Sequence, residues 1–336
     1  MLEKSGFTNK TIISTILKKY NIKVTKIEKL NRGSANIYLL NDKYILKEFQ
    51  SKYTKKEIMK EIKVINHLRK DKLPVPEYIQ TVSKRYCFTY KGKVVVMQKY
   101  IEGYTIENNE GNFEQTIESA TYLGKIAASL ETLKLDLPSN DVTSWVKEEK
   151  IDKAINKHKD LLNMLNGEYK SQIEKDLKDK LNMLEGIKKI DFSGLDKLTI
   201  MNTHGDYSLL QFIYENGKIK SIIDFAAACR MPIVWEVIRS FSYIDPKSKD
   251  GNLDFDDLVA YVKEFNKYVK LNEYDIKYMS FIYLIQILIS DYGYKQYLND
   301  NSKVDLLKFG FYRTNLCRFL YDNAQKISDL LKDAIK

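Results

Sequence analysis

The spacing of apolar residues divides the chain into a mixed first part and a mostly helical second part. Isoleucine and leucine recur at helical spacing within Thr8–Tyr20, and a second helical pattern covers Thr54–Lys70. Strand-like segments flank Asn41-Asp42 and Lys91-Gly92, two pairs typical of hairpin turns. The first hundred residues therefore predict a helix, a hairpin, a second helix and a second hairpin.

Helical patterns dominate the rest of the chain. One covers Phe113–Leu135, two share Trp145–Ile187, and others run from Ile233 to the end, with a β-rich segment at Leu198–Phe225 between them. At 336 residues the chain is too long for one small core. We predict an α+β fold with a mixed N-lobe at 1–101 and a helical C-lobe at 102–336, which contains a β-island at 198–225.

The charge is distributed unevenly between the two parts of the chain. The chain is 44% apolar and 30% charged, as expected of a globular protein, and its net charge is +10. Residues 1–100 hold 23 Lys and Arg against 8 Asp and Glu, whereas the remainder holds 32 against 37. Nucleic-acid binding is one reading of the basic part. The lysines lie within helix and strand patterns without interleaved aromatic residues, so a solvated surface is favoured and nucleic acid is an unlikely partner.

Three features bear on the compartment. The longest apolar run, Phe281–Ile289, is too short to span a bilayer, and no apolar leader follows Met1. The three cysteines have no CxxC spacing, which suits a reducing environment. We expect a cytoplasmic protein without a membrane partner.

The most specific pattern is His204-Gly205-Asp206 followed, 18 residues after the aspartate, by Asp224 at the end of an apolar run. Phosphoryl transfer from ATP needs one carboxylate to orient the attacking hydroxyl and a second to hold the metal that bridges the phosphates. We predict Asp206 as the catalytic residue and Asp224 as a ligand of Mg²⁺. Gln211 occupies the position at which a protein kinase loop has a metal-binding Asn, so it is predicted as the second ligand. His204 is expected to support the loop.

Features of the first part suit a nucleotide. Gly33 and Ser34 lie in a small-residue loop between strands, where backbone N–H groups can approach phosphates. Lys47 ends a strand and would pair with the phosphates. Glu61 on the next helix would hold this lysine, with Glu57 as the alternative one turn earlier.

The strand Val94–Ile101 is predicted to continue into a hinge between the lobes. Backbone groups around Gln98, Lys99 and Ile101 would bond the base. Because a backbone hinge does not separate adenine from guanine, ATP is the expected nucleotide and GTP is not excluded.

From Lys29 to Ser240 the chain resembles the aminoglycoside phosphotransferase and choline kinase family of protein-kinase-like enzymes. The resemblance is carried by His204-Gly205-Asp206, Ile223-Asp224-Phe225 and the segment with Lys47, Glu61 and Leu73-Pro74-Val75-Pro76. It implies a two-lobed kinase fold that moves the γ-phosphoryl group of ATP to a hydroxyl of a small molecule. Asp206, Asp224 and Lys47 match the family's catalytic, metal-binding and nucleotide-binding positions.

The resemblance also places Glu236 and Arg239 on the helix that follows the metal-binding aspartate. Residues three apart face the same side of a helix, so we expect this pair to brace the catalytic loop. Met231-Pro232 follows Asp224 too soon for a long activation loop, which favours a small acceptor over a protein.

The acceptor is expected to resemble an aminoglycoside, an amino sugar or choline, because the second part is mildly acidic. The acidic run Asp254–Asp257 has a plainer reading as a helix N-terminus, which we favour. Gln211, Ala226 and Glu131 depart from the family pattern. Gln211 keeps open an alternative function, a weakly active or inactive nucleotide-binding pseudokinase with a structural role like that of spore-coat relatives, whereas the other two departures leave Asp206 and Asp224 in place.

Overall fold

A computed structural model describes residues 2–30 and 35–335. The chain forms two compact units. The first contains Met1–Thr105, Thr132–Lys134 and Gln211–Ala228, and the second contains Ile106–Glu131, Leu135–Leu210 and Cys229–Lys336. The first unit holds an antiparallel sheet and the second is mostly helical, which confirms the predicted α+β class.

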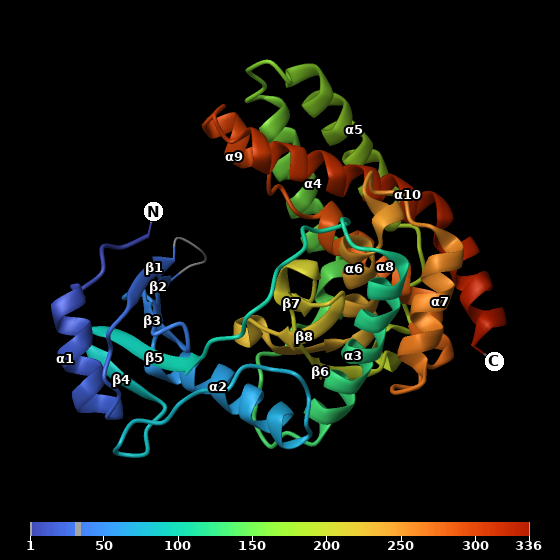
Figure 1. The fold of residues 1–336 in the computed structure, drawn as a ribbon. Helices are drawn as coiled ribbons and strands as arrows, with labels where there is room; N and C mark the ends of the chain where they lie inside the picture. The colour runs from blue at the N-terminus through green and yellow to red at the C-terminus, as the bar shows by residue number, and fades with distance from the viewer. Residues whose placement is uncertain (1, 31–34, 336) are drawn as a thin grey trace. The chain divides into compact units, whose positions relative to one another are not determined.

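The sheet of the first unit has five antiparallel strands in the order β1-β2-β3-β5-β4 (Figure 1). Both predicted hairpins are confirmed. Asn41 and Asp42 have φ values of 53° and 55°, and Lys91 and Gly92 have values of 46° and 80°. Positive φ at both central residues gives the turn twist that joins neighbouring strands directly. The strands are β1 (Ile27–Leu30), β2 (Ala35–Leu40), β3 (Tyr44–Phe49), β4 (Cys87–Tyr90) and β5 (Lys93–Lys99).

Two helices belong to this sheet unit. Helix α1 (Asn9–Tyr20) begins at Thr8, whose side chain accepts a hydrogen bond from the Thr11 amide. Its buried residues form one core cluster with sheet residues that include Leu46 and Met97. Helix α2 (Lys55–Lys70) begins at Thr54 in the same way, with apolar residues buried along one side. Both helices were predicted from their periodicity.

The predicted β-rich segment is divided between the two units. The hairpin of β7 (Phe212–Glu215) and β8 (Lys218–Ile222) counts with the first unit. The pair of β6 (Ile200–Thr203) and β9 (Cys229–Pro232) counts with the second. Strand β9 was not predicted, because it is short and leads directly into a helix.

The second unit is built from helices, and two of them, α6 and α8, are buried along most of their length. Helix α8 packs against α6 and α10, and α3 packs against α6, α7 and β6. A separate cluster of apolar residues joins α4, α5, α9 and α10. No described helix combines the length and the apolar character needed to cross a membrane. The helices are α3 (Phe113–Glu131), α4 (Glu148–Leu162), α5 (Lys170–Ile187), α6 (Ile233–Ile244), α7 (Phe255–Asn266), α8 (Glu273–Leu288), α9 (Tyr294–Asn299) and α10 (Val304–Ala334).

Two details of this unit bear on the sequence predictions. Helix α3 ends at Glu131, four residues before the predicted Leu135, because Thr132–Lys134 leaves the helix and packs with the first unit. Asp254 is the N-cap of α7 and accepts a hydrogen bond from the Asp257 amide, so the reading of this acidic run as a helix N-terminus is confirmed.

Candidate active site

Lys47 and Glu61 lie on neighbouring elements of the first unit. Lys47 is on β3, in register with Val96 of β5. Glu61 is in the middle of α2, is only 7% exposed, and accepts a hydrogen bond of 3.2 Å from the Tyr78 hydroxyl. Glu57, the alternative partner, is exposed and caps its own helix by accepting from the Thr54 amide. The structure therefore assigns Glu57 to the cap and leaves Glu61 beside Lys47.

The electrostatics of Glu61 join three of the predicted residues. Burial raises the pKa of its carboxyl above the ordinary value, the Lys47 ammonium lowers it, and the Asp224 carboxylate raises it again. Such effects require charges a few ångströms to about a nanometre apart. Lys47, Glu61 and Asp224 are thus gathered in one unit, although they are far apart in the sequence.

Gln211 and Asp224 flank the open end of the β7–β8 hairpin. The Ile223 amide donates to the Gln211 carbonyl at 2.9 Å, which brings the two chain segments together. Asp224 is exposed and has a left-handed backbone, with φ 64° and ψ 62°. Aspartate is among the residues that adopt this conformation most readily after glycine, and Asn41, Asp42 and Lys91 adopt positive φ in the hairpin turns of this chain.

The surroundings of Asp224 fix its position. Phe225, the next residue, is 1% exposed, and the short turn η4 (Phe225–Ala227) packs against α2. The Ile222 amide donates to the Pro74 carbonyl at 2.7 Å, which ties β8 to the Leu73-Pro74-Val75-Pro76 segment. The helix that carries Glu61 therefore supports the turn that carries Asp224.

The chemistry of Asp224 and Gln211 fits a magnesium ion. A carboxylate and an amide carbonyl are hard oxygen donors, and Mg²⁺ usually takes one or two protein carboxylates together with water and substrate phosphates. Across residues 2–30 and 35–335, no three His, Cys, Asp or Glu side chains form a closed metal site. An open site with few protein ligands is the kind that these residues can form.

The predicted hinge uses part of its backbone within the sheet. The Lys99 amide donates to the Glu77 carbonyl at 2.9 Å, and the Tyr100 amide donates to the Lys43 carbonyl at 2.8 Å. Gln98 is buried and in register with Ile45 of β3. Because the amides of Lys99 and Tyr100 already donate hydrogen bonds within the first unit, the amide expected to contact a base is that of Ile101. Gly33 and Ser34, the predicted phosphate loop, lie outside the described residues.

In the second unit, Glu236 holds the loop that contains Asp206. Its fully buried carboxylate accepts hydrogen bonds from the Thr203 hydroxyl at 2.8 Å, the Gly205 amide at 2.5 Å and the Tyr207 amide at 3.1 Å. Charge-assisted bonds of this kind are stronger than neutral ones. The loop is therefore tied at three points to one residue of α6.

Arg239, one turn further along α6, fixes the carboxylate of Asp206. Its guanidinium donates to Asp206 Oδ1 at 2.5 Å and to the Tyr207 carbonyl at 3.4 Å, and it lies 3.7 Å from Glu236 Oε1. The Asp206 side chain is still 48% exposed, against 15% for Arg239. The predicted bracing role of Glu236 and Arg239 is confirmed. The direct bond from Arg239 to Asp206 was not predicted.

His204 and Tyr207 complete the loop. The Asp206 amide donates to His204 Nδ1 at 3.2 Å, and the side chains of His204 and Tyr207 are fully buried. The Tyr207 hydroxyl donates to the Ser119 carbonyl at 2.8 Å. The supporting role predicted for His204 agrees with this contact. Tyr207 and Tyr78 were missed, because a single tyrosine in a loop carries no periodic signal.

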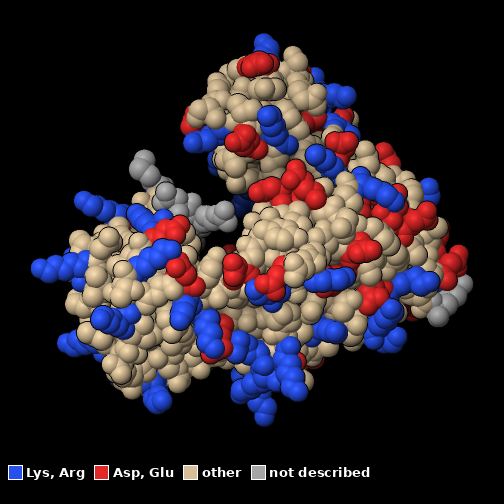
Figure 2. Space-filling model, in the orientation of Figure 1, with Lys and Arg blue, Asp and Glu red and all other residues tan. Residues whose placement is uncertain are grey.

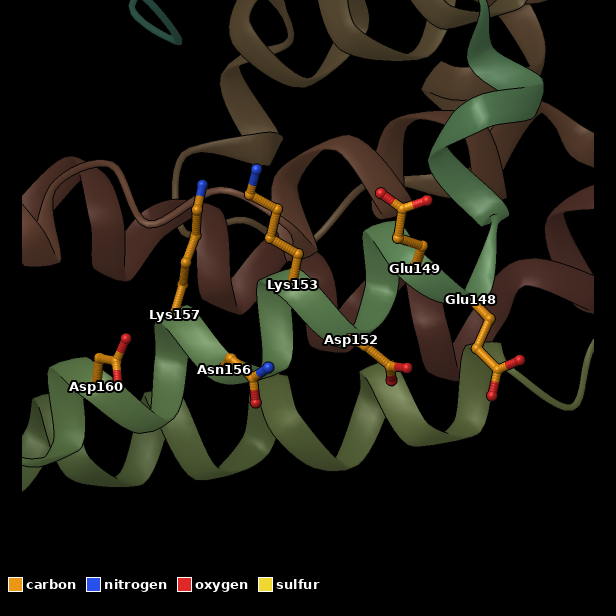
Figure 3. Close-up of a pocket in the computed structure, with 7 residues that line it drawn as sticks. All are labelled: Glu148, Glu149, Asp152, Lys153, Asn156, Lys157 and Asp160. Atoms are coloured by element: carbon orange, nitrogen blue, oxygen red, sulfur yellow. The ribbon is translucent and has the colours of Figure 1, made fainter.

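A pocket of about 660 Å³ lies elsewhere in the second unit, along α4 (Figure 3). Its side chains carry both charges, and Asp152 pairs at 2.6 Å with Lys188, the residue that follows α5. The residues that line it include none of those predicted for the active site. They are Glu148, Glu149, Asp152, Lys153, Asn156, Lys157 and Asp160.

Comparison with known proteins agrees with this geometry. A model of the phosphotransferase enzyme family matches residues 26–261. No curated protein sequence matches the chain. Among solved structures, an aminoglycoside phosphotransferase from Alicyclobacillus acidocaldarius is 13% identical with a TM-score of 0.67, and the match covers 97% of this chain and 98% of that one.

Two further structures have the same fold. Spectinomycin phosphotransferase in complex with ADP and spectinomycin is 13% identical, with a TM-score of 0.66 over 96% of this chain and all of that one. Amicoumacin kinase in complex with AMP-PNP is 11% identical, with a TM-score of 0.60 over 95% and 94%. The kinase-like fold predicted from the sequence is thereby confirmed.

Proposed function

Since the chain belongs to the phosphotransferase enzyme family, as its motifs predicted, we propose that it transfers the γ-phosphoryl group of ATP to a hydroxyl of a small molecule. The observation that carries this proposal is the Asp206 carboxylate, which Arg239 holds while about half of the side chain stays exposed. A fixed and accessible carboxylate can orient the acceptor hydroxyl and take its proton.

The first unit would bind the nucleotide. Lys47 would neutralise the phosphates, Glu61 would keep Lys47 in place, and the backbone at Ile101 would contact the base. The amicoumacin and spectinomycin enzymes were solved with an ATP analogue and with ADP, which supports a nucleotide here. ATP is the proposed phosphoryl donor. GTP is also compatible, because a contact made by backbone groups does not distinguish guanine from adenine.

Asp224 and Gln211 would hold a magnesium ion, which supplies charge neutralisation at the β- and γ-phosphates when bound. The side chain of Gln is one methylene longer than that of Asn, which moves its oxygen by about 1.5 Å. The contact between the Ile223 amide and the Gln211 carbonyl fixes the backbone at this point, so the extra length has to be taken up by the side chain.

For the acceptor we propose a hydroxylated molecule of the aminoglycoside, amino-sugar or choline kind. The similar structures include a spectinomycin phosphotransferase and an amicoumacin kinase, both named for small-molecule substrates, and the second part of this chain has a slight excess of acid. The proposed location is the cytoplasm, on the argument from the cysteine pattern.

The proposal predicts that ATP with Mg²⁺ stabilises the protein and that Asp206→Asn abolishes transfer. At a ligand concentration of 100 Kd the gain in unfolding free energy is about 2.7 kcal/mol, or a rise in Tm of roughly 3–5 °C for a chain of 336 residues. The experiment compares thermal unfolding with ATP and Mg²⁺, ATP and EDTA, and GTP and Mg²⁺. Transfer of labelled γ-phosphate to an acceptor panel is then measured for both proteins.

Asp206→Asn should keep the stabilisation by the nucleotide and lose at least about 100-fold in turnover. Absence of stabilisation by any nucleotide would refute the proposed kinase.

The alternative is a nucleotide-binding protein without turnover, and the identity of Gln211 is the observation that favours it. It predicts stabilisation by ATP that is the same with Mg²⁺ and with EDTA, and no transfer by the wild type. Under this alternative Gln211→Asn, which places the shorter amide at the metal position, should restore the dependence on Mg²⁺.

A further inference from the structure

Arg313 of α10 differs from the other arginines of the second unit. Arg230, Arg239 and Arg318 each lie within 4 Å of a carboxylate, at 3.5 Å, 2.5 Å and 2.6 Å. Within the part of the chain that the structure describes, Arg313 has no such ion pair. Its Nη1 donates to the Ser290 hydroxyl at 3.3 Å, and its Nε is buried without an acceptor.

A half-buried guanidinium without an ion pair, and with one N–H group lacking an acceptor, lowers the stability of the folded protein. Each buried N–H without a partner loses its hydration and gains nothing in return. The planar fork of arginine fits the two oxygens of a carboxylate or a phosphate. Its donors therefore point to an oxyanion that is bound from outside.

Aromatic rings connect Arg313 with the surface. The guanidinium lies 5.7 Å from the centre of the Phe309 ring. Phe309 contacts the rings of Tyr292 and Tyr243, at 6.2 Å and 6.1 Å between ring centres. Tyr292 is 41% exposed, and Phe309 is half-buried. A flat or apolar group next to the oxyanion would find a surface for stacking here.

The same rings connect Arg313 with Asp206. Arg239, which holds Asp206, lies 5.1 Å from the centre of the Tyr243 ring. The Tyr283 hydroxyl donates to the Tyr243 hydroxyl at 2.8 Å. Burial raises the pKa of Tyr283, and Arg239 and Arg313 each lower it. The guanidinium groups of Arg239 and Arg313 thus both lie within electrostatic reach of the Tyr283 hydroxyl. The separation between Asp206, which Arg239 holds, and Arg313 therefore suits a small molecule.

The charges around Arg313 leave a positive excess. Lys180 is buried and donates to the carbonyls of Ile287 and Ser290 at 2.8 Å and 2.7 Å. The pKa of Lys180 is lowered from 10.5 to about 8, mainly by burial and also by Arg313, whereas Cys317, Asp176 and Asp291 raise it. Asp176 is already paired with Arg318 at 2.6 Å, so Asp291 is the remaining acid beside Lys180 and Arg313, and an anion is favoured over a second cation.

We propose that Arg313 binds an oxyanion of the acceptor, a carboxylate or a phosphate, while Phe309 and Tyr292 contact its flat or apolar body. The inference rests on the proposed function, because the acceptor hydroxyl has to reach Asp206. Among the acceptors proposed above, it favours an amino sugar that also carries an anionic group, and it excludes choline and purely cationic aminoglycosides.

Four matched probes test this site without knowledge of the natural acceptor. They share a hydroxymethyl group on a benzene ring and differ at the para position. The four are 4-(hydroxymethyl)benzoate, its primary amide, 4-(hydroxymethyl)phenyl phosphate and 4-(hydroxymethyl)benzylamine. Their dissociation constants are measured by titration calorimetry in the presence of AMP-PNP and Mg²⁺. The carboxylate and phosphate probes separate the two sources of an oxyanion.

The benzoate, the phosphate or both should bind at least about tenfold more tightly than the amide and the amine, as expected for a charge-assisted contact. In Arg313→Met the ratio of the affinity for the anionic probe to the affinity for the amide should fall to near one. In Arg313→Lys the ratio should fall only in part, because lysine keeps the positive charge but lacks the planar fork of donors. Lys308→Met removes one exposed charge from the same helix and should keep the ratio.

Equal affinity for all probes, no binding of any probe, preference for the amine, or an unchanged ratio in Arg313→Met would each overturn the anion site. The ratio between matched probes does not respond to a merely structural role of Arg313. Stabilisation by ATP and Mg²⁺, measured on the same proteins, tests the proposed kinase separately.

Discussion

Two buried carboxylates of the second unit have opposite surroundings. Glu236 accepts three hydrogen bonds, and its charge is matched by Arg239. Asp245 follows the same helix and is also fully buried, but only the Ser248 hydroxyl donates to it, at 2.8 Å, and its Oδ1 has no partner in the described chain. The pKa of Asp245 is raised from 3.8 to about 6, mainly by burial and also by Asp257 and Asp254, against the opposing effects of Ser248 and Lys247.

This difference gives a prediction at the residue scale. Folded protein holds the proton of Asp245 more tightly than unfolded protein, so stability should fall as the pH rises from about 4 to about 6. Asp245→Asn removes this dependence. We expect its unfolding free energy, relative to the wild type, to increase by about 1–2 kcal/mol between pH 4 and pH 7. Urea denaturation at several pH values measures it, with exposed Asp250→Asn as the control. Parallel pH profiles for all three proteins would contradict the prediction.

Among the elements, the β7–β8 hairpin matters most for the site, because Gln211 and Asp224 stand at its open end. It is tied to the segment that follows β5 by a backbone pair: the Tyr104 amide donates to the Tyr214 carbonyl at 3.0 Å, and the Tyr214 amide donates to the Tyr104 carbonyl at 2.8 Å. Gly103 precedes this pair with φ 154°, and a Cβ there would collide with the Tyr214 carbonyl and the Ile213 side chain.

Gly103→Ala should therefore disturb the hairpin. The collision should lower the unfolding free energy by about 2–3 kcal/mol and reduce the stabilisation by ATP and Mg²⁺, since the hairpin positions Asp224. Gly92→Ala is the matched control, because φ there is 80° but no atom lies within 4 Å of the added carbon. It should cost only about 1 kcal/mol of backbone strain. Equal losses in the two variants would show that the backbone pair does not hold the hairpin.

At the scale of the whole molecule, the distribution of charge bears on the nucleotide. The first hundred residues hold 23 Lys and Arg against 8 Asp and Glu. On the face drawn in Figure 2, these basic side chains are distributed widely over the sheet-bearing unit. A field of this kind attracts a polyanion such as ATP at long range and is screened by salt.

We therefore expect the affinity for ATP to fall with ionic strength. Raising salt from about 50 mM to about 500 mM should weaken ATP binding roughly 3- to 10-fold, because the Debye length falls well below the size of the unit. Adenosine, which has no phosphates, should bind with the same affinity throughout. Titration calorimetry at several salt concentrations measures both. A matching loss for adenosine would mean that salt acts on the fold and not on the electrostatic attraction.

The sequence by itself determined the local structure and the identity of the chemical groups. Helical spacing gave α1 and α2, and the turn residues Asn41-Asp42 and Lys91-Gly92 located both hairpins, because these signals depend on neighbours within a few positions. The motif around Asp206 and Asp224 indicated phosphoryl transfer for the same reason. Its catalytic assignment is still a prediction.

The tertiary structure decided which of these groups meet. The sequence favoured Glu61 as the partner of Lys47 and left Glu57 as an alternative, and packing shows that Glu57 caps the helix while Glu61 lies buried within electrostatic reach of Lys47. The bond from Arg239 to Asp206 and the lack of an ion pair at Arg313, within the described residues, were equally hidden. Burial and pairing join residues tens to hundreds of positions apart, and no local pattern in the chain encodes such contacts.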